Sequence, residues 1–225
     1  MPTWAALSFQ NSASPAMEQL ISFHDLTMAI LTSIITLVLT SMSLILTYKM
    51  TDIFLLQDQT VEIVWTVVPV FILLIIALPS LQTLYTLDDP FLPEMSIKTL
   101  AHQWYWSYEY SDFKSIEFDS YLIMTNSTNT LPRMMDTDTS LVIPSKTKVR
   151  VLTTSTDVIH AWTVPSMGLK ADAVPGRLNQ LMLSSTRPGL FFGQCSEICG
   201  INHSFMPIKL EVIPMNMFVN WVTSM

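Results

Sequence analysis

The amino-acid sequence contains little charge and little glycine. Charged residues make up 13% of the 225 residues and hydrophobic residues 50%, whereas a typical soluble domain carries about 25% charged residues. The hydrophobic content rules out a disordered chain, and the shortage of charge makes a purely soluble globular protein a poor interpretation. With only five glycines, the chain is neither collagen-like nor a glycine-rich linker.

Basic residues and cysteines are also few. Eleven Lys and Arg stand against eighteen Asp and Glu, which gives a formal net charge of −7. We expect no nucleic-acid partner, because phosphate contacts need a basic surface. Two cysteines exclude a disulfide-rich scaffold but are enough for one bridge or for a metal site.

Two long uncharged runs account for much of the hydrophobic content. They cover residues 26–48 and 63–87, and the first would form a helix about 34 Å long, which exceeds the roughly 30 Å of a bilayer core. The second contains Pro69 and Pro79, which membrane helices tolerate. We therefore expect a transmembrane hairpin. The alternative, two buried core helices, is disfavoured by the length of both runs.

The hairpin divides the chain into an N-terminal segment (1–25), a membrane anchor (26–87) and a separate domain (88–225). It also places the first and last parts on the same side of the membrane. Lys49 is the only basic residue close to a span, and the positive-inside rule favours an inner location for its loop. The N-terminus has neither a basic leader nor an Arg-rich amphipathic stretch, so no cleaved targeting peptide is expected.

The domain that follows residue 88 has the pattern of an all-β fold. Short runs rich in β-branched and aromatic residues alternate with prolines, which is typical of a β-sandwich or barrel. All five glycines fall between 168 and 200, where we expect loops. Residues 215–225 predict a short terminal helix. The predicted strands cover 96–100, 103–110, 141–143, 148–154, 158–164, 180–184 and 208–212.

Potential metal ligands gather in one stretch near the C-terminus. Cys195, Cys199, His203 and Met206 lie close together in sequence, and His160 ends a predicted strand further upstream. Thiolates and thioethers are soft ligands, and a thioether favours copper over zinc. Two imidazoles, a thiolate and a weak methionine are typical of a mononuclear copper site. The second cysteine fits a pair of copper ions bridged by both thiolates.

Other interpretations of these residues remain open at this point. Cys195 and Cys199 are close enough in sequence to form a disulfide, or to bind zinc together with His160 and His203. A methionine such as Met206, taken alone, is more often a core residue than a metal ligand.

An aromatic run at 102–110 is the second unusual feature. On a strand, its alternate residues, including Trp104, would share one face. Such a face is typical either of a core, of a membrane-interface belt or of a partner-binding patch. Acidic residues follow it and would attract a basic protein, although scattered carboxylates usually form only a solvated surface. Glu62, at the start of the second span, marks the end of that span or a point where protons enter.

Taken together, these residues resemble subunit II of cytochrome c oxidase, in particular the mitochondrially encoded form of animals. The resemblance covers nearly the whole chain and includes the two-span hairpin. Its most specific segments are Cys195-Ser-Glu-Ile-Cys199-Gly-Ile-Asn-His203-Ser-Phe-Met206-Pro207, Trp104-Tyr105-Trp106, Pro165-Ser-Met-Gly-Leu-Lys170, Val174-Pro-Gly-Arg-Leu-Asn-Gln180 and Arg187-Pro-Gly189.

The resemblance implies a cupredoxin-like β-barrel on a two-helix anchor and a binuclear copper centre, CuA. Glu197 matches the residue whose backbone carbonyl binds one copper and whose side chain reaches a magnesium ion shared with subunit I. Trp104 matches the ring through which electrons enter from cytochrome c. Glu62 matches a carboxylate near the start of a proton path into subunit I. The side-chain copper ligands that the resemblance implies are His160, Cys195, Cys199, His203 and Met206.

The same resemblance implies a function, partners and a location. The chain would accept electrons from cytochrome c and pass them to haem in subunit I, where oxygen is reduced to water and protons are pumped. Its partners would be cytochrome c, subunit I, other oxidase subunits and membrane lipid. It would lie in the mitochondrial inner membrane, with the copper domain and both termini in the intermembrane space.

One surface departs from the family pattern. Family members often carry acid at positions 114 and 115, where this chain has Lys114 and Ser115. The docking surface for cytochrome c is then less acidic at this point. The acidic residues that the resemblance assigns to docking are Glu109, Asp112, Asp119 and Asp157. Quinol-oxidase subunits share the anchor and barrel but lack the copper ligands, and nitrous oxide reductase shares the copper centre but not the anchor.

Overall fold

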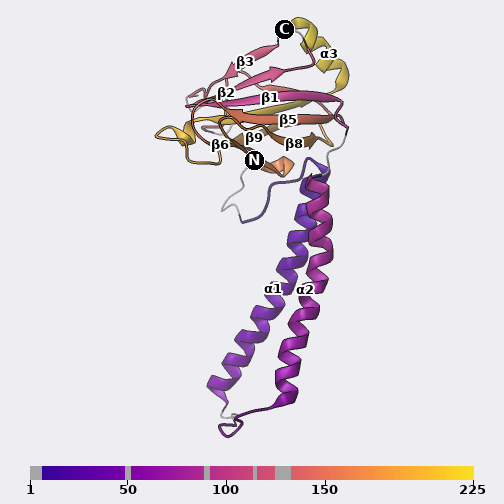
Figure 1. Ribbon diagram of the computed structural model, residues 1–225, viewed down its shortest axis with the longest axis vertical. Helices are drawn as coiled ribbons and strands as arrows, with labels where there is room; N and C mark the ends of the chain where they lie inside the picture. The colour runs from indigo at the N-terminus through magenta and orange to yellow at the C-terminus, as the bar shows by residue number, and fades with distance from the viewer. Residues whose placement is uncertain (1–6, 49–51, 89–91, 114–115, 125–132) are drawn as a thin grey trace. The chain divides into compact units, whose positions relative to one another are not determined.

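The computed structural model describes residues 7–48, 52–88, 92–113, 116–124 and 133–225. The expectations for Lys49, Lys114 and Ser115 concern residues outside these ranges. The chain divides into two units: one contains residues 19–86, and the other contains residues 1–18 and 87–225. Each unit is described by itself (Figure 1).

The unit of residues 19–86 consists of two long helices that form a hairpin (Figure 1). Helix α1 spans Pro15–Thr47 and α2 spans Gln59–Asp88. Both are long and apolar enough to cross a membrane, and α2 continues through Pro69 and Pro79 as expected. Several Thr and Ser hydroxyls on α1 donate to the carbonyl one turn earlier, for example Thr36 to Thr32 at 2.7 Å. This bond satisfies a hydroxyl that would otherwise face lipid unpaired.

The second unit is built from β-sheets that enclose one hydrophobic core. A five-stranded sheet has the order β3-β2-β1-β5-β8, a three-stranded sheet the order β4-β10-β9, and β6 pairs with β7. The strands are β1 (Met95–His102), β2 (Tyr105–Tyr110), β3 (Glu117–Ser120), β4 (Leu141–Pro144), β5 (Lys148–Ser155), β6 (His160–Val164), β7 (Leu169–Ala173), β8 (Asn179–Ser184), β9 (Gly189–Gln194) and β10 (Pro207–Ile213). The short helices are η2 (Pro165–Met167), η3 (His203–Phe205) and α3 (Met215–Ser224).

The core follows from the alternation of the strands. On β5 every second residue is buried, because successive side chains point to opposite faces of a sheet, whereas β4 is buried throughout. Tyr110 links the two main sheets: its hydroxyl donates to the Val142 carbonyl at 2.7 Å and accepts from the Val142 amide at 2.9 Å. A buried tyrosine is tolerated here because both of its polar functions are satisfied.

Residues 7–18 belong to the β unit rather than to the helical one. The Ala13 amide donates to the Ser166 carbonyl, and its carbonyl accepts from the Thr186 amide, each at 2.9 Å. Ser14 donates from its hydroxyl to the Met167 carbonyl at 2.7 Å. These bonds join the start of the chain to η2 and to the segment after β8.

The aromatic run requires a correction. It is not one strand: β1 ends at His102, β2 begins at Tyr105, and the two residues between them form the turn of a hairpin in which His102 pairs with Tyr105. Trp106, Tyr108 and Tyr110 do share a buried face, but Trp104 lies in the turn. The prediction failed because this turn contains none of the residues that usually mark one.

The region between residues 168 and 200 is less rich in loops than its glycines indicate, and the strand predicted at 180–184 is confirmed. It contains β7, β8 and β9. The glycine pattern misled because Gly189 and Gly193 both lie within β9. At Gly193 the reason for glycine is a close approach of two backbones: a Cβ added there would overlap the carbonyl oxygen of Thr163 on β6.

We expect Gly193→Ala to destabilise the β unit by about 3 kcal/mol, near the upper end of the usual cost of overpacking, because a backbone carbonyl cannot rotate away as a side chain can. Thermal unfolding of the purified protein measures the change. Leu190→Ala, at an exposed position on the same strand, is the control and should change stability by about 0.5 kcal/mol or less. Equal stability of the two variants would show that β6 and β9 are free to separate.

Candidate metal centre

The potential ligands come from three places that the fold brings together. His160 is the first residue of β6, Cys195 follows β9 directly, and Met206 immediately precedes β10. The connection between β9 and β10 carries Cys199 and His203. It is tied down by two backbone bonds: the Cys195 amide donates to the Met206 carbonyl at 3.3 Å, and the Ser196 amide donates to the Ala161 carbonyl at 3.1 Å.

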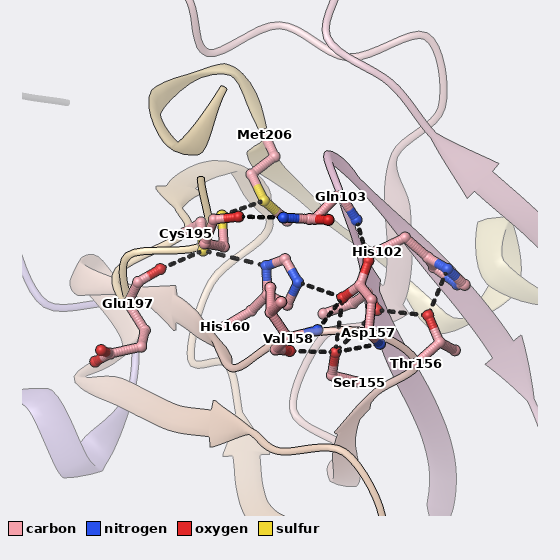
Figure 2. A network of polar contacts seen from close by, with 12 residues as sticks. His102, Gln103, Ser155, Thr156, Asp157, Val158, His160, Cys195, Glu197 and Met206 are labelled. Atoms are coloured by element: carbon pink, nitrogen blue, oxygen red, sulfur yellow. Dashed lines mark hydrogen bonds and ion pairs between the residues drawn. The ribbon is translucent and has the colours of Figure 1, made fainter. Parts of the chain in front are cut away.

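Both cysteines are buried and unlinked. Ligand atoms of His160, Cys195 and Cys199 all lie within 4.8 Å of one another. The Cys195 sulfur is 3.8 Å from Nδ1 of His160. The Cys199 sulfur is 3.5 Å from Nδ1 of His203 and 3.6 Å from the Met206 sulfur. All five expected side-chain ligands therefore converge, as Figure 2 shows for the residues it labels.

Asp157 fixes the orientation of the buried His160 ring. Its carboxylate lies 2.9 Å from Nε2 of His160 and also accepts from the backbone amide of Val158 at 2.6 Å. Because a carboxylate only accepts, Nε2 donates its proton to Asp157, and the ring is held with Nδ1 facing the Cys195 sulfur. In many metal sites a carboxylate accepts from the far ring nitrogen of a ligating histidine and so orients the ring. Sequence reasoning placed Asp157 in partner docking and did not predict this contact, although its position three residues before His160 was visible.

The two thiols differ in acidity. Burial raises the pKa of the Cys195 thiol, but its contacts with His160 and with nearby backbone groups outweigh burial and lower that pKa overall. Burial and the charge of Cys195 both raise the pKa of Cys199. Burial alone would lower the pKa of His160, yet its contacts with Cys195 and Asp157 raise it. Cys195 is therefore the first thiolate to form, and metal binding would remove the second proton.

Trp104 lies beside this centre and is attached to it through Gln103. The side-chain amide of Gln103 donates to the Cys199 carbonyl at 2.6 Å, and its backbone amide donates to the Asp157 carboxylate at 2.6 Å. Figure 2 shows Gln103 between Asp157 and the cysteine loop. Nothing in the sequence pointed to Gln103, because its role depends on a turn that sequence patterns do not reveal.

Trp106, unlike the half-buried Trp104, is part of the core and supports the cysteine loop. Trp106 is fully buried, its indole nitrogen donates to the Met206 carbonyl at 3.4 Å, and its ring meets the His160 ring edge-on at 6.2 Å. Trp106 therefore keeps water away from the side of the centre on which the His160 ring lies.

Glu197 and Glu62 are placed differently. The Glu197 carbonyl accepts from the Cys195 thiol at 3.4 Å, while its carboxylate points away from the sulfurs (Figure 2). This carbonyl is a further potential ligand, and the carboxylate is exposed. Glu62 lies in the first turn of α2, in the other unit.

The four expected docking acids are engaged within the chain. Glu109 forms an ion pair with Lys98 at 3.1 Å, and Asp112 accepts from the Ser96 amide at 2.6 Å. Asp119 accepts from the Ser107 hydroxyl at 2.6 Å, and Asp157 holds His160. Of the four, Asp157 is the one bonded directly to a potential metal ligand.

The donor set fits copper. Two unlinked thiols, two imidazole nitrogens, a thioether and a backbone carbonyl make up a soft site, and the thioether close to a thiol is unusual for zinc. A two-helix anchor followed by a cupredoxin-like β domain with such a site defines a class of membrane-bound metalloproteins.

Comparisons with known proteins identify the family. The family model for the transmembrane domain of cytochrome c oxidase subunit II matches residues 2–83, and that for its periplasmic domain matches residues 95–213. The chain belongs to the cytochrome c oxidase subunit II family. It is 55% identical to cytochrome c oxidase subunit 2 of Simulium vittatum and 53% identical to that of Drosophila melanogaster, with 100% of this chain and 99% of each relative covered.

A solved structure agrees with this assignment. The periplasmic domain of subunit II of cytochrome oxidase from Bradyrhizobium japonicum is 41% identical, with a TM-score of 0.56 over 59% of this chain and 94% of that one. The cupredoxin-like fold is thus confirmed, and the chain is a membrane protein and a subunit of a terminal oxidase. The family match and the cluster of His160, Cys195 and Cys199 together indicate a copper site.

Proposed function

We propose that this chain is the subunit through which electrons enter the oxidase. It takes electrons from cytochrome c at a binuclear CuA centre and delivers them toward haem in subunit I, where oxygen is reduced to water and protons are pumped. The observation that carries the proposal is the convergence of two unlinked thiols on two histidines and one methionine. A mononuclear copper site of the two-histidine type uses only one thiolate, whereas two thiolates can bridge a pair of copper ions.

The side chains have distinct roles in this proposal. Cys195 and Cys199 would hold the copper ions together with His160 and His203, whose Nδ1 atoms face the two sulfurs. Met206 and the Glu197 carbonyl are the weaker ligands. When bound, the copper pair supplies a centre that gains and loses one electron. Asp157, Gln103 and the backbone bonds of the loop hold the ligands in place with or without metal, which limits rearrangement when the charge changes.

The remaining assignments rest on the family resemblance and on the exposure of the residues. The Glu197 carboxylate is exposed, which suits a magnesium ion shared with subunit I. Glu62 in the first turn of α2 suits the start of a proton path. We place the chain in the mitochondrial inner membrane, with the copper domain and both termini in the intermembrane space.

Docking of cytochrome c supplies the test of this function. Glu109, Asp112, Asp119 and Asp157 would attract a basic partner, so its association should weaken steadily as salt rises. The measurement is the rate at which reduced cytochrome c is oxidised by the purified oxidase across a salt series. A rate that does not respond to salt would remove the acidic residues from docking, and no oxidation at any salt would refute the function itself.

We expect Met206→Leu to leave copper bound while shifting its reduction potential. Leucine conserves most of the volume of this buried side chain, so packing should change by less than about 1.5 kcal/mol, but the thioether is lost. Redox titration of the copper absorption measures the shift. An unchanged potential would mean that Met206 only fills space.

A further inference from the structure

Gly200 stands where the cysteine loop meets the turn that carries Trp104. It follows Cys199 directly and has a φ of +126°, a conformation that side-chain-bearing residues rarely adopt. A Cβ added here would lie 3.1 Å from Cζ2 of Trp104, 3.4 Å from its Nε1 and 3.2 Å from Nε2 of Gln103. The first two distances belong to the ring proposed to receive electrons, and the third to the amide that bonds the Cys199 carbonyl.

The position of the Trp104 ring depends on this packing. Its indole nitrogen is buried and has no hydrogen-bond partner among the residues that the structure describes, so none of their polar groups fixes the ring. What fixes it is contact with the loop below and the attachment of the preceding residue, Gln103, to Cys199 and Asp157. A side chain at position 200 would intrude on both.

We propose that Gly200 is a positioning residue for electron transfer: the absence of a side chain lets the Trp104 indole and the Gln103 amide rest directly on the loop beside Cys199. The inference rests on the proposed role of Trp104. Residue 200, which is not itself a ligand, sets how closely the Trp104 ring approaches the cysteine loop.

The test is Gly200→Ala in the assembled oxidase. We expect the copper absorption and potential to be retained and the KM for cytochrome c to stay the same, because ligands and docking acids are untouched. The electron-transfer rate per copper-loaded centre should fall roughly three- to tenfold, since an ångström of misplacement can cost about 100-fold and the neighbours here must move by less. A cryo-EM structure of the variant should show the Trp104 ring displaced from Cys199.

Gly176→Ala is the control for alanine at a positive-φ glycine that has no close neighbour among the described residues. Gly176 also has positive φ, at +75°, but a Cβ there would meet nothing within 4 Å in the described chain. We expect its electron-transfer rate to equal that of the unmodified protein. An equal loss in both variants would overturn the proposal in favour of strain alone.

A double variant separates the steric contact from damage to the loop. Phenylalanine at position 104 lacks both indole atoms that a Cβ would approach. Adding Gly200→Ala to Trp104→Phe should therefore lower the electron-transfer rate by less than about twofold. That is a smaller loss than Gly200→Ala causes alone, so the two effects are not additive. An undiminished cost would overturn the proposal. If Gly200→Ala alone binds no copper, recovery of copper in the double variant supports the steric conflict, and an equally empty double variant overturns it.

The same series distinguishes this inference from the proposed function. If Trp104→Ala transfers electrons normally, the role of Trp104 fails. If Trp104→Ala is slow while Gly200→Ala is normal with its ring in place, only the inference about Gly200 fails.

Discussion

Replacement of either cysteine by serine is expected to abolish the mixed-valence copper spectrum and turnover with cytochrome c. Each sulfur faces a histidine, at 3.8 Å for Cys195 and 3.5 Å for Cys199, and in the proposed centre each bridges the two ions. Loss of a residue that only supports a ligand, without binding the metal itself, typically costs about 10- to 100-fold in metal affinity. Loss of a bridging ligand should therefore cost more than about 100-fold.

The measurements are copper content, the copper absorption spectrum and turnover of each variant. Ser204→Ala, at an exposed position in the same loop, is the control and should keep all three. A serine variant that still binds two copper ions with an unchanged spectrum would refute the bridging assignment.

The second large effect is expected from Trp104→Ala. Removing the ring takes away the group nearest the cysteine loop on the proposed path from cytochrome c, while the docking acids remain. We expect electron transfer to slow by about 10- to 100-fold with little change in KM, the pattern of an interaction that serves the transfer step and not binding. Stopped-flow mixing with reduced cytochrome c separates the two quantities.

Tyr121→Phe provides the comparison for Trp104→Ala. Tyr121 is an exposed aromatic residue that stacks on Tyr105 at 4.6 Å, and phenylalanine conserves that ring. This variant should transfer electrons at nearly the normal rate. Normal turnover of Trp104→Ala would instead return Trp104 to a purely structural role.

The cluster of potential metal ligands was visible in the sequence because most of its members are close together in the chain. Cys195, Cys199, His203 and Met206 belong to one loop, so their chemistry is visible without the fold. The membrane helices were predictable for a similar reason, because length and hydropathy are local properties. Of the ligands, His160 alone had to be brought in from a distant strand, and its position at the strand end made it a candidate.

The features that sequence reasoning missed depend on the three-dimensional fold. The turn at residues 103 and 104 lacks the usual turn residues, so the hairpin was read as one strand. Asp157 looked like any exposed acid, and only the fold shows that it holds the His160 ring. Gly193 suggested a loop, whereas it lies in a strand. Glycine is needed at this position because the Thr163 backbone passes so close.

The central claim concerns two copper ions held by both cysteines. Metal analysis of the purified oxidase, with copper assigned to this subunit by its absorption and electron spin resonance, tests it most directly. The account predicts two copper ions per chain that share one unpaired electron, with neither cysteine available to thiol reagents. A single ion, zinc in place of copper, or a disulfide between Cys195 and Cys199 in the active enzyme would contradict it.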